Sequence, residues 1–434
     1  MDMDIEKRTI RKITWRIVPF IMILYLIAYI DRVNIGFAAI TMKEDLGFTS
    51  SILGFGAGIF FLGYFLFEVP SNIILHKVGA RIWIARVMVT WGIIAGGMAF
   101  IESSTSFYVM RFLLGIAEAG FFPGIILYLS FWFPARNRAG VIALFMAAAP
   151  IATAIGSPIS AALLEMHGIM GLAGWQWMFL IEAFPAVILG VVVFFYMTDR
   201  PEKATWLSQD ERDWLVKTMQ AENTGKSTQQ HHSIIRGLAN PHVLALALVY
   251  FGTSAGLYTL GIWAPQIIKE LGVSSMTVGL LNAIPPIVSV VAMILWSRHS
   301  DKTNERTWHV ALACITAAIG LVIAAGTGSV IGLIAALTIV NVGISCSKPP
   351  LWSMPTMFLS GAAAATGIAT INSIGNLGGF AGPAMIGWVK DQTGSFTGGL
   401  YFVAGLLILS TVITLVLSFT QKKDKASAAE LSNT

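Results

Sequence analysis

Residues 17–40 read IVPFIMILYLIAYIDRVNIGFAAI, an apolar run of bilayer length that contains one adjacent acid and base, Asp31 and Arg32. A helix needs roughly 20 apolar residues to cross the hydrocarbon core of a membrane. An ionised side chain that faces lipid is costly, so such residues persist where they face a protein interior or a water-filled cavity. The stretch therefore predicts a membrane-spanning helix with a functional site at Asp31 and Arg32.

A second charged pair, Arg111 and Glu118, lies in another apolar segment, residues 108–131. Seven residues are close to two turns of an α-helix, so these two side chains share one helix face. We expect both pairs to line a charged cavity in the N-terminal half of the chain. The alternative for Arg111 and Glu118 is a buried ion pair that only joins helices.

The whole chain repeats this apolar pattern. Hydrophobic residues make up 56% of its 434 residues and charged residues only 12%, whereas about a quarter of a soluble domain is charged. The two cysteines, Cys314 and Cys346, show no CxxC or Cys/His spacing, so neither a disulfide framework nor a metal site is predicted. The segments predicted to span the membrane are residues 17–40, 51–75, 81–101, 107–132, 140–164, 176–197, 243–268, 276–297, 308–326, 330–358, 363–388 and 399–419.

Basic residues are concentrated in every second loop between these segments. By this reading 22 of the 28 Lys and Arg residues fall on one side of the membrane and three on the other. This is the positive-inside pattern, which places both termini in the cytoplasm. The net charge of +5 therefore sets topology, and no nucleic-acid partner is predicted.

A polar stretch divides the chain into four predicted parts: an N-terminal six-helix bundle (1–198), a cytoplasmic linker (199–240), a C-terminal six-helix bundle (241–421) and a cytoplasmic tail (422–434). In the linker, residues 207–215 predict a short amphipathic helix. Ser208 would cap it, with Glu211 three residues later as the capping-box partner. The fold class is an all-α membrane protein with 12 transmembrane helices in two pseudo-symmetric bundles.

Several motifs resemble one known family. The chain resembles the major facilitator superfamily, and within it the anion:cation symporters that include bacterial hexuronate, galactonate, tartrate and phthalate permeases. The resemblance implies alternating access by rocking of two six-helix halves. The motifs that carry it are residues 29–36 (YIDRVNIG), 68–72 (EVPSN), 79–86 (GARIWIAR), 111–124 (RFLLGIAEAGFFPG), 132–134 (WFP), 157–158 (SP) and 364–383 (AATGIATINSIGNLGGFAGP).

Transport of an organic anion needs a cation for the carboxylate and a titratable group for the proton. Arg32 suits the first task because a guanidinium stays charged and binds a carboxylate in a two-pronged fork. Asp31 and Glu118 are candidates for the second, with Arg111 beside them. The resemblance implies the same roles, with the first-span arginine as substrate anchor and the two acids as protonation sites.

The resemblance also implies substrate contacts for Tyr29, Tyr64 and Asn372. Each has an ordinary structural alternative, because a buried tyrosine is often only packed and a buried amide can hold membrane helices together. A proton needs a single carboxylate whereas sodium needs several oxygen ligands, so we expect a proton to be the coupling ion and no cofactor.

Residues 347–355 (SKPPLWSMP) depart from the pattern of the sugar-acid carriers around the matching tryptophan, Trp352, which we expect to contact the substrate. We expect the prolines Pro349 and Pro350 to break the helix and release carbonyls. Lys348 either faces the cavity, where it would suit a second electronegative group, or extends to the headgroups. Residues 146–153 offer only Thr153 to a polyhydroxy substrate, which favours an aromatic or dicarboxylic acid; the alternative is a sugar acid or tartrate.

Two other function classes are disfavoured. A membrane enzyme would need a catalytic motif, and the sequence has no HExxH, GxSxG or Walker A pattern. A channel would show filter-like loops or pore-lining rings. The sequence therefore predicts a monomeric proton symporter, not an enzyme, in the bacterial inner membrane, whose partners are a small organic carboxylate, protons and lipid.

Overall fold

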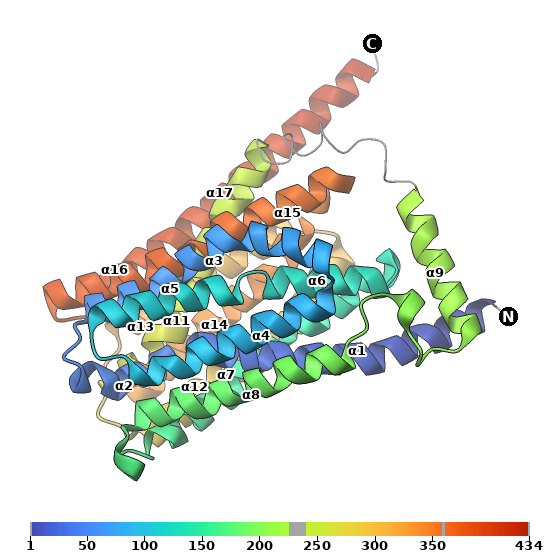
Figure 1. Cartoon of the computed structure of the whole chain (residues 1–434). Coiled ribbons are helices and arrows are strands. Elements are labelled where there is room, and N and C mark those ends of the chain that lie inside the picture. The colour runs from blue at the N-terminus through green and yellow to red at the C-terminus, as the bar shows by residue number, and fades with distance from the viewer. Residues whose placement is uncertain (1, 225–239, 358–360, 433–434) are drawn as a thin grey trace. The chain divides into compact units, whose positions relative to one another are not determined.

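A computed structural model describes residues 2–224, 240–357 and 361–432 (Figure 1). Over these ranges the regular secondary structure is helical, with no strand. Eleven helical segments of the described residues are long and apolar enough to cross a membrane. The predicted fold class is confirmed.

The chain forms two compact units, Met1–Met42 with Ile59–Gln229, and Lys43–Gly58 with Gln230–Thr434. Helix α3 (Ser50–Val78) starts in the second unit and ends in the first. The other helices of the first unit are α1 (Asp2–Val33), α2 (Ile35–Asp45), α4 (Ala80–Gly97), α5 (Ser104–Glu118), α6 (Phe121–Trp132), α7 (Ala135–Leu164), α8 (Gly174–Tyr196) and α9 (Gln209–Thr224), with the end of α2 assigned to the second unit. The second unit adds α11 (Pro241–Lys269), α12 (Ser275–Thr303), α13 (Thr307–Gly326), α14 (Val330–Ser353), α15 (Gly361–Asn376), α16 (Gly378–Thr393) and α17 (Thr397–Ser432).

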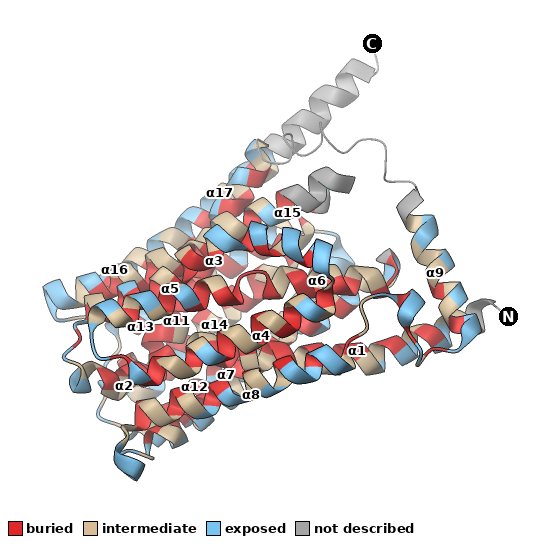
Figure 2. Ribbon diagram, viewed as in Figure 1, coloured by how far each residue is buried: buried red, intermediate tan, exposed pale blue. Residues whose placement is uncertain are grey.

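Glycines bring membrane helices close together in both units. In the first, a Cβ on Gly92 of α4 would lie 2.7 Å from Val187 of α8, and one on Gly190 would lie 2.7 Å from Val89. In the second, Gly343 of α14 lies directly against α13. Lipid supplies little hydrophobic force between helices, so close backbone packing at small residues holds them together. Exposed positions recur along the helices (Figure 2). Many of them are large apolar residues, among them Phe184, Phe195 and Leu295, as expected for surfaces in contact with lipid.

The first turn of α3 is fastened to α16 within the second unit. The Asp391 carboxylate accepts hydrogen bonds from the backbone N–H groups of Ser50 and Ser51, at 2.9 and 2.7 Å. These are among the four N–H groups that a helix start leaves without an intrahelical partner. Burial raises the pKa of Asp391, but the hydrogen bonds from Ser51 and Ser50 outweigh it and lower the pKa to about 2.

Three predicted spans are interrupted. The first breaks at Asn34, between α1 and α2, and the fourth breaks at Ala119 and Gly120, between α5 and α6. The segment predicted over 363–388 is formed by α15 and α16, which are 16 residues each and separated at Leu377, so it is not among the eleven long apolar helices. Irregular backbone at membrane depth is tolerated where protein surrounds it.

The predicted break at Pro349 and Pro350 is wrong, because α14 continues through both prolines to Ser353. The proline ring fixes φ at a helical value and removes one backbone donor. The helix can therefore continue although the carbonyls four residues earlier, those of Ser345 and Cys346, lose their usual amide donors.

A helix, α9, covers Gln209–Thr224, where the sequence predicted a shorter one over residues 207–215. Glu211 accepts from the backbone N–H of Ser208 at 2.9 Å, as the capping box requires, whereas the Ser208 hydroxyl turns to Asp210. The Glu211 carboxylate also pairs with Arg8 at 3.1 Å and with Lys12 at 2.9 Å. These pairs attach α9 to the first turns of α1.

Glu211→Gln should loosen this attachment. The Glu211 side chain is only 3% exposed, and its loss as a charged acceptor should cost about 1–3 kcal/mol. Amide hydrogen exchange in α9 should then be roughly tenfold faster or more. Asp213→Asn is the matched control, since Asp213 accepts only a local bond from Gln209 among the described residues. Equal exchange in both variants would contradict the attachment.

The same contact has a defined pH dependence. Burial raises the pKa of Glu211, but bonds from the Ser208 N–H and Lys12 outweigh it and hold the pKa below its ordinary value. A lowered pKa means that the contact contributes fully above the ordinary glutamate range, about pH 4.3. Its contribution is lost as the pH falls through the lowered value, so neutral and mildly acidic buffers should leave α9 in place.

Candidate substrate and proton site

Asp31 and Arg32 occupy the last turn of α1, directly before the break at Asn34. The backbone hydrogen bonds continue across it, from Asn34 N–H to Ile30 O and from Phe37 N–H to Asn34 O, both at 2.9 Å. Asp31 is 2% exposed, and the Arg32 side chain is 9% exposed. The end of α1 therefore holds an acid and a base inside the first unit rather than at its surface.

Arg32 forms an ion pair with Glu118, the last residue of α5, whose side chain is 1% exposed. Arg111 is also 1% exposed and interacts electrostatically with both Glu118 and Arg32. The two guanidiniums lie over one ring, with Cζ of Arg32 at 5.5 Å and Cζ of Arg111 at 5.1 Å from the Phe60 centroid. The structure brings together three of the predicted residues and adds Phe60, which the sequence did not single out.

The aromatic side of this cluster depends on close contact between α3 and α5. A Cβ on Gly115 would lie 2.0 Å from the Phe60 carbonyl oxygen, and one on Gly63 would lie 2.5 Å from the Phe112 carbonyl oxygen. Tyr64 follows one turn after Phe60, and its ring centroid lies 5.4 Å from Cζ of Arg32. Cation–π attraction of this kind contributes about 0.5–2 kcal/mol. The two aromatic rings of α3 therefore help to hold the Arg32 guanidinium in place.

Gly120 makes the break that ends α5 at Glu118. Its backbone has φ +89° and ψ −6°, a left-handed conformation that costs other residues about 1–2 kcal/mol. A Cβ there would lie 2.0 Å from Ser71 Oγ. Ser71 cannot easily move, because it donates to Ala119 O at 2.6 Å and accepts from Trp83 Nε1 at 2.8 Å.

Gly120→Ala should therefore lower the stability of the protein by more than the left-handed backbone strain alone would. Overpacking adds about 1–3 kcal/mol, and the variant should show a lower unfolding temperature in detergent. Gly168→Ala is the matched control, since Gly168 has φ +86° and ψ −14° with nothing within 4 Å of a Cβ. Equal loss of stability in the two variants would show that Ser71 does not restrict this position.

The predicted tyrosines are both buried, Tyr29 at 5% and Tyr64 at 3% exposure. Tyr64 lies beside Arg32, as described above. The Tyr29 ring meets that of Tyr25, with centroids 6.0 Å apart. Substrate contact by these residues stays a prediction.

Asp31 lies beside residues that the sequence interpretation missed. Its Oδ2 accepts a 2.7 Å hydrogen bond from Trp91 Nε1 of α4. It also experiences electrostatic repulsion from Glu182 of α8 and from Glu118. Glu182 is a single acid inside the apolar segment 176–197, so the rule that identified Asp31 would have identified it as well.

In the second unit, Trp352 of α14 packs on Tyr250 of α11, with ring centroids 4.9 Å apart. Tyr250 also lies against Gly375 of α15, where a Cβ would be 2.0 Å from its ring. Asn372 is 8% exposed, one turn before Gly375. Lys348 of α14 is half-buried, and no ion pair to it is found among the described residues. Roles for Lys348, Trp352 and Asn372 stay predictions.

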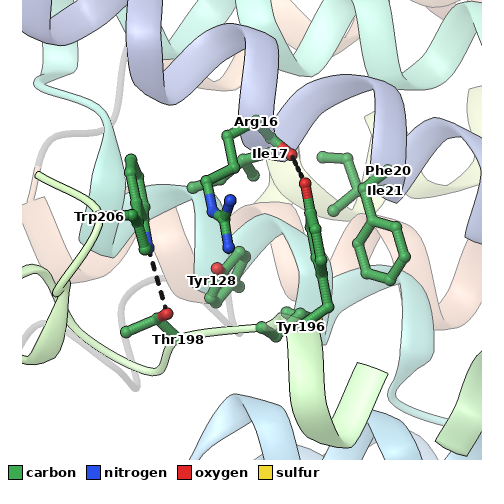
Figure 3. A pocket seen from close by; sticks show the side chains of 9 residues that line it. Arg16, Ile17, Phe20, Ile21, Tyr128, Tyr196, Thr198 and Trp206 are labelled. Carbon is green, nitrogen blue, oxygen red and sulfur yellow. Dashed lines mark hydrogen bonds between the residues drawn. The ribbon is translucent and has the colours of Figure 1, made fainter. Parts of the chain in front are cut away.

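A small cavity beside the middle of α1 is accounted for by the packing of one arginine. Figure 3 shows the Arg16 guanidinium between the rings of Tyr196 and Trp206, at 4.6 and 4.9 Å from their centroids. Tyr196 donates to the Arg16 carbonyl at 3.1 Å, and Trp206 donates to Thr198 at 3.3 Å. Arg16 therefore fills this aromatic cage and fastens the start of the linker to α1.

The family profile, the similar sequences and a solved structure all relate this chain to membrane transporters. A sequence profile of the Major Facilitator Superfamily matches residues 21–383. Two proteins of Agrobacterium vitis, each named "Putative tartrate transporter", are similar throughout. One is 72% identical over 433 residues, covering 100% of both chains. The other is 73% identical over 420 residues, covering 97% of this chain and 93% of its own.

A solved structure shares the fold. The inward-facing, unoccupied crystal structure of a bacterial homologue of the human lysosomal transporter Spinster superposes with a TM-score of 0.77. The match covers 94% of this chain and 97% of that one, at 15% sequence identity.

Proposed function

Because this chain belongs to the Major Facilitator Superfamily, a family of membrane transporters, we propose that it imports a small organic dicarboxylate together with protons. Membership makes it a multi-pass transporter rather than an enzyme, as the sequence predicted. The resemblance stated from its motifs is confirmed at the level of the superfamily.

One observation carries the proposal: Arg32, 91% buried by its side chain, meets Glu118 inside the first unit. A guanidinium that already holds one carboxylate can exchange it for a carboxylate of the substrate, since both bind the same planar fork. Protonation of Glu118 would release Arg32 for that exchange. Proton binding and anion binding are then linked by one coupling free energy.

The choice of a dicarboxylate is supported from two sides. The relatives at 72% and 73% identity carry names that refer to tartrate, a dicarboxylate. Lys348 is a second cation inside an apolar segment, which suits an acid with a second negative group. The apolar residues around Thr153 still favour an aromatic acid over a sugar acid.

Reconstituted vesicles with an inward proton gradient would test the proposal. Labelled tartrate and phthalate should accumulate, uptake should persist in sodium-free buffer, and a protonophore should abolish it. Lys348→Gln should reduce uptake of tartrate more than that of benzoate, which lacks a second carboxylate. Uptake of galactonate or glucuronate alone would refute the substrate class, and uptake that requires sodium would refute the coupling ion.

A further inference from the structure

Glu182 is a second acid beside Asp31 and has no part in the ion pair of Arg32. It is 6% exposed in the middle of α8. Its Oε1 accepts a 2.6 Å hydrogen bond from Ser160 of α7, and the Asn34 side chain also interacts with it. No Lys or Arg forms an ion pair with Glu182 in the part of the chain that the structure describes.

The two carboxyl groups have the same arrangement of partners. Asp31 accepts from Trp91 on Oδ2, and Glu182 accepts from Ser160 on Oε1. The other oxygen of each, Oδ1 of Asp31 and Oε2 of Glu182, is buried without a hydrogen-bond partner among the described residues. A buried anionic oxygen without a donor or cation is costly, whereas a carboxyl that carries a proton on that oxygen removes the charge.

The charges near Asp31 and Glu182 link the number of protons that this pair binds to the binding of an anionic substrate. The groups that act on Asp31 are Glu182 and Glu118, and Glu118 interacts in turn with Arg32 and Arg111. With protons on Asp31 and Glu182, this cluster carries one net positive charge while Glu118 is ionised and two once Glu118 is protonated, and both states suit a carboxylate ligand. With both acids ionised it carries one net negative charge, which repels the same ligand.

We propose that Glu182 is a second proton-binding site of the transporter, which titrates together with Asp31 and adds a proton to each transport cycle. Asp31 of α1 is held by Trp91 of α4. Glu182 of α8 is held by Ser160 of α7 and interacts with Asn34, which follows α1. Two carboxyl groups that repel each other lose their protons in two coupled steps. The first proton then leaves more readily than the second. Because the charge of the pair also decides whether an anion is attracted to Arg32, the number of protons bound by the pair depends on whether substrate is bound there. The inference rests on the proposed function and specifies its proton stoichiometry.

Infrared difference spectroscopy on the purified full-length protein tests the site without transport. As the pH is lowered, C=O bands of protonated carboxyl groups should appear. One of these bands should be missing in Glu182→Gln, and the band of Asp31 should appear at a different pH than in wild type. Glu165→Gln is the matched control, because Glu165 is an exposed acid at the end of α7. An identical titration in Glu182→Gln and wild type would overturn the proposal.

Proton counting in vesicles tests its part in transport, with tartrate as the probe. In Glu182→Gln the slope of accumulation against the proton gradient should fall by about one proton per substrate, while substrate exchange continues. Glu182→Asp should restore the slope, which excludes a defect of folding. An unchanged slope in Glu182→Gln would overturn the inference. If wild type shows no uptake driven by the gradient, the proposed function fails, whereas the infrared titration still decides the role of Glu182.

Discussion

Arg32→Ala is expected to reduce uptake of the substrate by about 100-fold or more. Truncation of one partner in a buried, hydrogen-bonded charge pair costs about 2–5 kcal/mol, and about 1.4 kcal/mol corresponds to a factor of ten. Arg32 is the cation that the first unit holds beside Glu118, Phe60 and Tyr64. Initial uptake rates in vesicles, normalised to folded protein, measure the effect. Arg32→Lys should retain part of the activity, because lysine keeps the charge but lacks the two-pronged fork.

The double variant Arg32→Ala with Glu118→Gln separates the two explanations of this loss. In the single variant Glu118 is left as a buried carboxylate without its ion-pair partner, which by itself destabilises the site. The double variant removes that charge. Because Glu118 is itself a proposed proton site, the double variant is compared with Glu118→Gln alone, by substrate exchange. If Arg32 binds substrate, exchange in the double variant stays far below that in Glu118→Gln; equal exchange would show that Arg32 only neutralises Glu118 and would refute its role as an anchor.

Asp31→Asn is expected to lower accumulation against a proton gradient while substrate exchange across the membrane continues. Asparagine keeps an oxygen that can accept the hydrogen bond from Trp91 but cannot bind or release a proton. A transporter that loses one of its coupled protons concentrates the substrate less steeply. The slope of accumulation against the proton gradient should therefore fall by about one proton per substrate, while exchange is retained. Vesicles with and without a proton gradient provide both measurements.

Asp213→Asn is the control for this change, because it makes the same substitution on the linker helix α9, outside the site. It should leave both accumulation and exchange unaltered. Undiminished accumulation in Asp31→Asn would contradict proton coupling at this residue. A loss of exchange as well would assign Asp31 to the binding of substrate.

Much of the site could be predicted because charge in an apolar segment is conspicuous. Asp31, Arg32, Arg111 and Glu118 were each identified by this rule. The structure pairs Arg32 with Glu118 and places the guanidiniums of Arg32 and Arg111 over the Phe60 ring. The linker helix was predicted from its capping residues. The break at Pro349 was predicted wrongly, because proline removes a hydrogen bond but keeps a helical φ.

The sequence by itself determined the class of protein, since segment length and hydropathy state directly which residues lie in the membrane. It also determined which helices carry buried charge. Only the tertiary structure decided that Arg32 meets Glu118, that Trp91 holds Asp31 and that Glu182 lies beside it. Periodicity specifies the face on which a side chain lies but not the helix that this face meets. That choice depends on where backbones can approach, at residues such as Gly63 and Gly115, and on breaks such as Gly120 that turn one helix end toward another.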